Sequence, residues 1–294
     1  MNRIEYVAGM DIGVMIFPTD QTMDPVELAR ESEARGFESL WFPEHSHIPT
    51  SRETPWGGNE GAPPLPSFYW RTHDPFVALG ACAAVTTKLK LGTGICLVAQ
   101  RDPIHTAKEV ASLDRISGGR MLFGVGYGWN KEEMNHHGTA YGDRRDILRE
   151  NVLAMKELWT QEEAAFDGEH VRFSSSWSWP KPTQPGGPPV ILGGNAGPRT
   201  AAHIAEFCDG WMPIGGRHPL ERWDLIVDAC HAVGRDPESI ERGLFGARPD
   251  EAKLNELASA GISRAVLGLP QGPRDDVLRA LDELAPLVEA MREA

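Results

Sequence analysis

The sequence lacks the features of a membrane or secreted protein. No apolar run among its 294 residues approaches the roughly 20 residues that span a bilayer, and the N-terminus MNRIEYVAG has no long apolar segment of the signal-peptide type. The four cysteines show no CxxC spacing and lie in apolar segments, as reduced core thiols do. We therefore expect a cytoplasmic protein with free thiols.

Basic residues are also scarce. The chain has 29 Lys and Arg against 42 Asp and Glu, which gives a formal net charge of −13. General nucleic-acid binding needs a concentrated positive surface, so we expect neither a nucleic-acid nor a membrane partner. An anionic ligand is still compatible with this charge, because a binding site depends on local groups and not on the sum.

The motifs of the common hydrolases are missing as well. No GxSxG occurs, and no Ser-His-Asp arrangement is evident. The pairs His45-x-His47 and His136-His137 have the residue type of metal ligands, but later strands end without a His or Asp placed to complete such a site. We expect no metal.

The sequence does contain a regular alternation of strand and helix signals. Asp-Pro dipeptides at 24–25, 74–75 and 102–103 have the form of an N-cap followed by Pro at the first helical position. The expected strands are 10–18, 38–43, 89–97, 120–125, 189–192, 209–214, 240–247 and 263–269. The expected helices begin near 25, 75, 103, 144, 198, 220, 251 and 274.

Eight strand-helix units predict a parallel sheet, because consecutive strands joined by helices run the same way. A doubly wound sheet is the alternative. The absence of a linker favours a single closed (β/α)8 TIM barrel over 10–294, and the length is close to the typical size of about 250 residues. An N-terminal extension is expected at 1–9, with Met10 as a candidate natural start. Insertions are expected after strand 2, at 48–71, and between helix 4 and strand 5, at 161–187.

Glycines mark the ends of the third and fourth strands, at Gly92-Thr93-Gly94 and 124–128. Active sites of such barrels lie at the carboxyl ends of the strands. Glycine there allows a sharp turn or a close approach to a flat group, so these ends suit a fused aromatic ring that carries a phosphate. The GxGxG pattern disfavours a dinucleotide fingerprint, because no helix is expected directly after it.

Several segments together resemble the luciferase-like flavin or deazaflavin oxidoreductases. They are WFPEHSHIP at 41–49, HDPFVALGACAAVTTKLKLGTGI at 73–95, its continuation to Glu133, and PPVILGGNAGPRTAAHIAEFCDGWMP at 188–213. The pattern is most similar to the branch that uses coenzyme F420. The resemblance covers nearly the whole chain and implies a luciferase-like barrel, which we expect to be a homodimer.

The resemblance also implies a set of cofactor-binding residues. A bulge at the end of strand 3, often with a non-proline cis peptide, supports the ring, and Thr93, Gly94 and Ile95 occupy that place. The loop after strand 5 binds the cofactor phosphate through backbone N–H groups, which the helix near Pro198 also offers. The residues of that loop are Gly193, Gly194 and Asn195, and those beside the ring are Gly126, Tyr127 and Gly128.

The implied catalytic residues are His45 and its neighbour Glu44. We expect His45 to donate or accept the proton that accompanies hydride transfer, with Glu44 orienting or tuning it. The same Glu-His pair occurs in two-component FMN monooxygenases, which take reduced flavin from a partner reductase and react it with oxygen. A non-catalytic flavin-binding barrel is a third alternative. Aromatic residues in 48–71 and 161–187 indicate an apolar or ring-containing small organic substrate.

Overall fold

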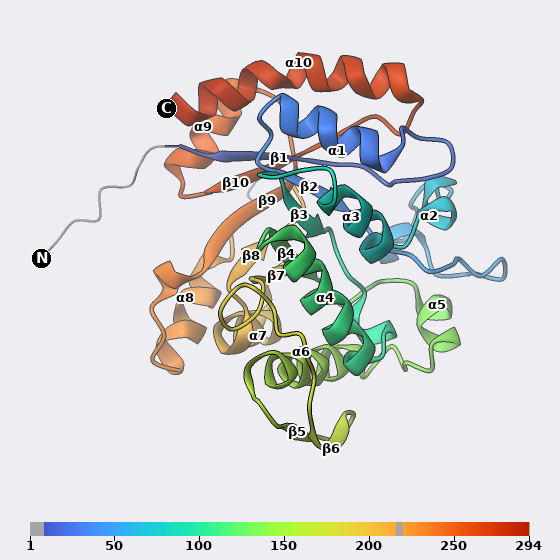
Figure 1. The fold of residues 1–294 in the computed structure, drawn as a ribbon, viewed down its shortest axis with the longest axis vertical. Coiled ribbons are helices and arrows are strands. Elements are labelled where there is room, and N and C mark those ends of the chain that lie inside the picture. Colours follow the sequence, from blue (N-terminus) through green and yellow to red (C-terminus); the bar gives the residue numbers. More distant parts are fainter. Residues whose placement is uncertain (1–8, 216–219, 294) are drawn as a thin grey trace, which may run out of the picture.

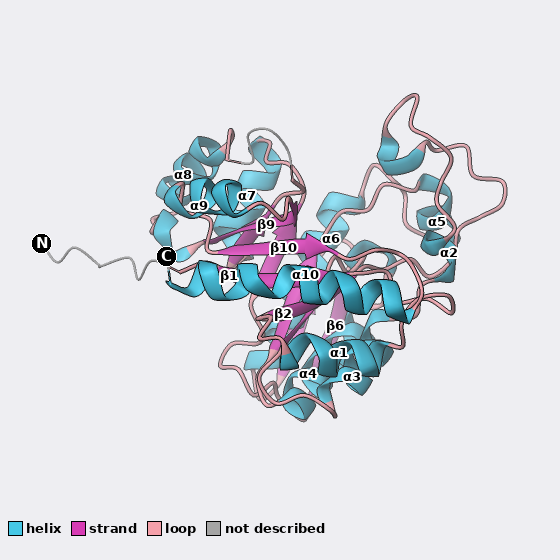
Figure 2. Ribbon diagram, turned by 90° about the horizontal axis from the view of Figure 1, so that it is seen from above, coloured by secondary structure: helices cyan, strands magenta, loops and turns pink. Residues whose placement is uncertain are grey.

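The computed structural model describes residues 9–215 and 220–293, and its centre is a closed barrel of parallel strands (Figures 1 and 2). Around the barrel the strands follow the order β1-β10-β9-β8-β7-β4-β3-β2. The closed barrel is confirmed, and a doubly wound sheet is wrong. The extension predicted at 1–9 lies outside the described residues except for Gly9. The barrel strands are β1 (Asp11–Met15), β2 (Ser39–Phe42), β3 (Lys90–Thr93), β4 (Met121–Val125), β7 (Val190–Gly193), β8 (Gly210–Met212), β9 (Glu241–Ala247) and β10 (Arg264–Gly268).

Helices surround the barrel, and the predicted Asp-Pro starts are confirmed (Figure 2). Asp24, Asp74 and Asp102 each cap a helix by accepting hydrogen bonds from backbone N–H groups of its first turn. The main helices are α1 (Pro25–Ala34), α3 (Pro75–Ala83), α4 (Pro103–Ser117), α6 (Arg144–Thr160), α7 (Pro198–Phe207), α8 (Trp223–Ala232), α9 (Glu251–Ser259) and α10 (Arg274–Glu293). The short ones are α2 (Phe68–Arg71), α5 (Lys131–His136), η1 (Trp56–Gly58), η2 (Val98–Gln100) and η3 (Pro237–Ser239).

Three sequence predictions need correction. The third strand ends at Thr93 and not at Leu97, because the chain turns there into η2. The helix predicted from Leu220 begins at Trp223. A helix does follow the GxGxG segment directly: α5, whose sequence KEEMNH is too short and polar to give an apolar periodicity.

Trp41 fills the interior of the barrel. Its side chain is fully buried with Leu122, Ile191, Met212 and Val266, and its Nε1 donates a hydrogen bond to Ser39 Oγ at 2.8 Å. A Cβ on Gly92 would clash with Cε3 of the Trp41 ring. The flat group that Gly92 approaches is therefore this indole, and the barrel centre is a packed core.

A buried charge network closes the amino end of the barrel. Arg264 of β10 is 3% exposed and contacts Glu38 and Glu241. Burial raises the pKa of Glu38, but Arg264 and Lys90 outweigh burial and lower it to about 2. The network links β10, β9 and the start of β2.

The insertion at 161–187 lies between α6 and β7, as predicted. Its strands β5 (Ala164–Asp167) and β6 (Arg172–Ser176) form the hairpin expected around Asp167-Gly168. Glu150 of α6 accepts N–H bonds from three residues of the turn, and Lys108 of α4 donates to the Trp179 carbonyl. The hairpin thus packs on the outer helices, away from the strand ends (Figure 1). The expectation that aromatic residues of this insertion indicate the substrate is therefore wrong. No helix in the described ranges is long and apolar enough to cross a membrane.

Candidate active site

His45 and Glu133 form a buried pair at the carboxyl end of the barrel. His45 follows β2 and Glu133 lies on α5, after β4; their exposed fractions are 8% and 0%. His45 Nδ1 lies 2.7 Å from Glu133 Oε2, and the Ser46 backbone N–H donates to Glu133 Oε1 at 3.1 Å. The pair has the geometry of a proton-transfer group held by a carboxylate.

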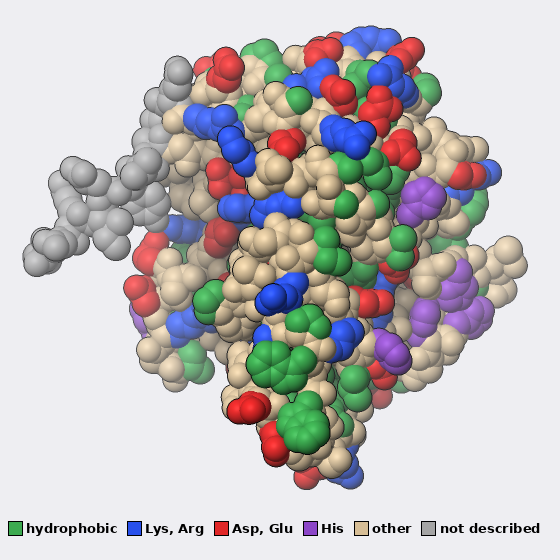
Figure 3. All heavy atoms as spheres, in the orientation of Figure 1, with side chains coloured by type: hydrophobic (Ala, Val, Ile, Leu, Met, Phe, Trp, Pro, Cys, Tyr) green, Lys and Arg blue, Asp and Glu red, His purple; other side chains and the backbone are tan. Residues whose placement is uncertain are grey.

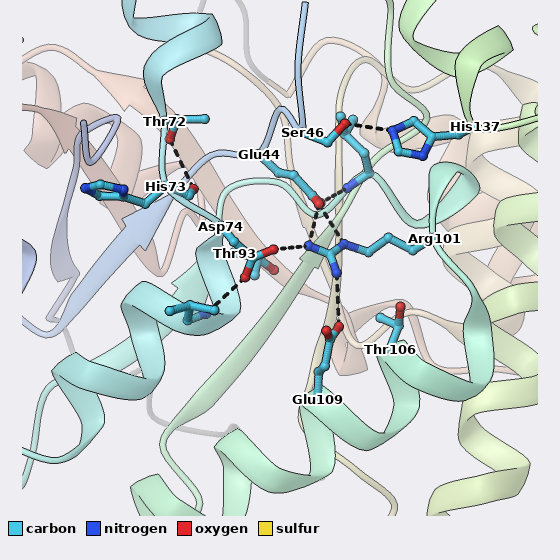
Figure 4. Close-up of polar contacts among 12 residues, drawn as sticks. Glu44, Ser46, Thr72, His73, Asp74, Thr93, Arg101, Thr106, Glu109 and His137 are labelled. Atoms are coloured by element: carbon cyan, nitrogen blue, oxygen red, sulfur yellow. Dashed lines mark hydrogen bonds and ion pairs between the residues drawn. The ribbon is translucent and has the colours of Figure 1, made fainter. Parts of the chain in front are cut away.

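Glu44 has a different environment from the one predicted. Its carboxylate accepts a hydrogen bond from the Leu97 backbone N–H at 2.7 Å and one from Arg101 Nε at 2.6 Å (Figure 4). Arg101 also contacts Asp74 and Glu109. The expectation that Glu44 orients His45 is therefore corrected: Glu133 makes that contact, and Glu44 holds the loop after β3.

Aromatic side chains surround His45. The ring of Tyr69 lies 5.2 Å from the His45 ring and that of Trp129 lies 5.8 Å from it, between centroids. Trp56 Nε1 donates to the Tyr69 hydroxyl at 2.8 Å, and Phe17 packs 4.7 Å from Tyr69. Two of these four rings come from the insertion at 48–71, which thus reaches the strand ends as predicted.

The predicted bulge after β3 contains a cis peptide bond between Gly94 and Ile95. The Ile95 side chain lies against two neighbouring strand ends, because a Cβ on Gly126 or Gly193 would lie 2.6 or 2.9 Å from its atoms. A Cβ on Gly94 would meet the Phe245 ring at 2.7 Å. The structure thus brings together Gly94, Ile95, Gly126 and Gly193, while the buried Thr93 hydroxyl donates to the Gly124 carbonyl.

The remaining predicted residues have separate environments. The Tyr127 hydroxyl lies 2.9 Å from His203 Nδ1 on α7, so it points between helices. Burial raises the pKa of Tyr127, and burial followed by the charge of Arg199 lowers the pKa of His203 to about 4. Gly128 has a φ of 73° and packs against Met134 of α5.

The loop between β7 and α7 is open. Gly194 has a φ of 100°, nothing lies within 4 Å of the Cβ it lacks, and Asn195 is exposed. Helix α7 begins after Gly197 without a side-chain cap, so its first N–H groups have no partner from a capping residue. These groups are available to an anion.

Three histidines form a surface cluster beside the site. His47 Nε2 lies 2.9 Å from His136 Nδ1, and Ser46 Oγ contacts both His47 and His137. Figure 3 shows histidine side chains gathered on the side that carries α5. Within residues 9–215 and 220–293, no group of three or more His, Cys, Asp or Glu side chains is arranged to hold a metal ion.

The barrel and the buried pair at its carboxyl end define a TIM-barrel protein with an enzyme-like site. Residues 10–283 match the luciferase-like monooxygenase family, and the chain belongs to this family of oxidoreductases. An uncharacterized protein of Mycobacterium tuberculosis is 39% identical over 281 residues, which cover 94% of this chain and 98% of the relative. The resemblance inferred from the sequence is therefore confirmed.

Two further similarities concern proteins with named activities. The F420-dependent hydroxymycolic acid dehydrogenase of Mycobacterium tuberculosis is 28% identical over 296 residues, covering 97% of this chain and 75% of the relative. The crystal structure of a monooxygenase from Streptomyces bottropensis has a TM-score of 0.73 at 20% identity, covering 97% of this chain and 98% of that one. The second similarity shows the fold alone.

Two residues of the site, Glu133 and Arg101, are not among those predicted from the sequence. Glu133 lies 88 positions from His45, and no local pattern connects the two. Arg101 stands 57 positions from Glu44. A usable signal for Glu133 was its place in the polar segment directly after a glycine-rich strand end, where barrels carry functional groups.

Proposed function

We propose that this chain transfers a hydride between coenzyme F420 and a small organic substrate. The observation that carries the proposal is the packing of Ile95 against Gly126 and Gly193, at the strand ends beside the one that carries His45. The similarity to an F420-dependent dehydrogenase supports the choice of coenzyme. When bound, the coenzyme supplies or accepts the hydride.

The residues present fit a ring with an anionic tail. Glycines at 126 and 193 let Ile95 lie flat against the strand ends, because side chains there would displace it. The open backbone at Gly194 and the uncapped start of α7 provide N–H groups for a phosphate. Thr93, Tyr127 and Gly128 would hold this frame from behind, and Asn195 would border the phosphate.

His45 would donate the proton that accompanies hydride transfer to a substrate, or accept it in the reverse direction. The rings of Tyr69 and Trp129 beside it favour an apolar or ring-containing substrate. Phe17 and Trp56 extend this aromatic group through their contacts with Tyr69. We place Glu44 in the support of the loop after β3, because its carboxylate is engaged by Leu97 and Arg101.

Titration of the purified protein with coenzyme F420 and with FMN, followed by fluorescence quenching, tests the coenzyme. Tight binding of F420 supports the proposal, and micromolar or tighter binding of FMN alone refutes it. That second result would favour a two-component FMN monooxygenase supplied by a flavin reductase. Binding without turnover of any substrate would instead indicate a non-catalytic flavin-binding barrel.

We also propose a cytoplasmic homodimer. All four cysteines are free and buried, which suits a reducing compartment. Exposed apolar side chains of Trp70, Val77 and Ile104 project from α2, α3 and the start of α4, and a second copy would cover them. Light scattering after size-exclusion chromatography measures the mass, and a monomer at micromolar concentration would contradict the dimer.

A further inference from the structure

We infer that Glu133 is a positioning residue that keeps a proton on His45 Nδ1 and thereby reserves Nε2 for the substrate. The inference rests on the proposed function only in assigning proton transfer to His45. The hydrogen-bond geometry that carries it belongs to the protein alone.

The hydrogen bonds of Glu133 determine which nitrogen of His45 carries the proton. An ionised carboxylate can only accept hydrogen bonds, so the 2.7 Å contact with Oε2 requires a hydrogen on Nδ1. The other oxygen accepts from the Ser46 backbone N–H. In the described ranges Glu133 pairs with His45 and with no lysine or arginine, so the imidazole N–H and the Ser46 N–H are the donors that satisfy this buried carboxylate.

Helix α5 holds Glu133 in place. The Asn130 side chain caps the helix by accepting the Glu133 backbone N–H at 3.3 Å. Met134, the next residue, is fully buried and packs against Gly128, where a Cβ would lie 2.5 Å from its methyl carbon. The cap and the packing of Met134 both hold the helix in place, so the Glu133 carboxylate has a fixed position from which it can orient the imidazole.

The rest of the ring is free to react. Tyr69 makes a tilted ring contact with His45 and Trp129 an edge-on one, and Nδ1 is the ring nitrogen with a hydrogen-bond partner among the described residues. In the reductive direction, the reduced coenzyme, when bound, would supply the hydride to the substrate carbon and be oxidised. The N–H bond at Nε2 breaks, its proton forms a bond to the substrate heteroatom, and its electron pair stays on Nε2. Nδ1 keeps its hydrogen throughout, and solvent later returns the proton to Nε2.

We expect the replacement of Glu133 by glutamine to change the tautomer of His45. The Ser46 N–H still needs an acceptor, so the amide oxygen should face Ser46 and the amide NH2 should face Nδ1. Because the amide NH2 donates a hydrogen bond, Nδ1 must accept it and therefore cannot carry a hydrogen. Glu133→Gln should therefore move the proton of the neutral ring from Nδ1 to Nε2.

The tautomer of the neutral ring can be read by NMR of protein labelled with 15N-histidine, without any cofactor, in a pH series that extends into the alkaline range. The His45 signals are assigned by their loss in His45→Gln. We expect an Nδ1–H tautomer in the wild type and an Nε2–H tautomer in Glu133→Gln. Glu150→Gln, which removes a similar backbone-capping carboxylate from α6, is the matched control and should keep the wild-type tautomer.

Turnover provides the second readout. We expect kcat of Glu133→Gln to fall by about 100-fold or more, the usual contribution of a positioned acid or base, with KM and coenzyme affinity nearly unchanged. An Nε2–H tautomer in the wild type, or an unchanged tautomer in Glu133→Gln, would overturn the inference. A reversed tautomer with unchanged kcat would uphold the positioning by Glu133 and remove His45 from the proposed reaction.

Discussion

Replacement of Arg101 by methionine tests whether Glu44 has a structural role. The guanidinium contacts three carboxylates, but these differ in burial: the side chain of Glu44 is 7% exposed, whereas those of Asp74 and Glu109 are 43% and 40% exposed. Methionine retains most of the apolar length of arginine. The substitution thus removes the positive charge of Arg101 and leaves the buried carboxylate of Glu44 without its partner.

The two exposed ion pairs each contribute about 0–1 kcal/mol. Removing one partner of a buried pair typically costs about 3–5 kcal/mol, because the other charge is left uncompensated. We therefore expect Arg101→Met to lower the free energy of unfolding by about 3–5 kcal/mol, mostly through Glu44.

A second substitution separates this charge effect from lost packing. Glutamine at position 44 can still accept the Leu97 N–H bond but carries no charge. The double variant Glu44→Gln, Arg101→Met should therefore be more stable than Arg101→Met alone, because no buried charge is left unpaired.

Urea unfolding followed by tryptophan fluorescence measures these differences, provided that the m-value is unchanged. Arg279→Met is the matched control, since its ion pair with Asp276 is exposed, and it should change stability by less than about 0.5 kcal/mol. A loss below about 1 kcal/mol in Arg101→Met, or a double variant no more stable than it, would refute the structural role.

Three further predictions follow from other parts of the molecule. Gly126→Ala places a Cβ 2.6 Å from Ile95 and should weaken coenzyme binding about tenfold in a fluorescence titration. Gly80→Ala is the control: nothing lies within 4 Å of the added Cβ, so coenzyme binding should not change. The Glu132 carboxylate accepts hydrogen bonds from two backbone N–H groups and one hydroxyl of residues 53–54. Glu132→Ala should therefore loosen this loop and speed trypsin cleavage after Arg52. An unchanged cleavage rate would contradict this role of Glu132. The folded pKa of Glu38, about 2, lies below its ordinary value of 4.5, so its stabilisation is present above pH 4.5 and is lost as the pH falls towards 2. Glu38→Gln should lose about 3 kcal/mol at pH 7 and show a flatter decline in acid-unfolding experiments than the wild type.

Much of the fold could be predicted because its signals are local. Aspartate before proline caps a helix through hydrogen bonds within one turn, and all three such starts occur where the sequence places them. Alternation of strands and helices then implies parallel strands. The cis peptide at Gly94–Ile95 was predictable for a different reason, through resemblance to a family to which the chain belongs.

The sequence by itself determined the barrel, the chain order of its eight strands and main helices, its family and the position of His45 at a strand end. Only the tertiary structure decided which carboxylate serves His45: Glu44 is adjacent in the chain, but its side chain turns to Arg101, and Glu133 reaches the ring from α5. The physical reason is that partners of buried charges are chosen by strand order and helix docking, which bring distant residues within 3 Å and separate neighbours. Periodicity and capping signals contain no information about such pairs.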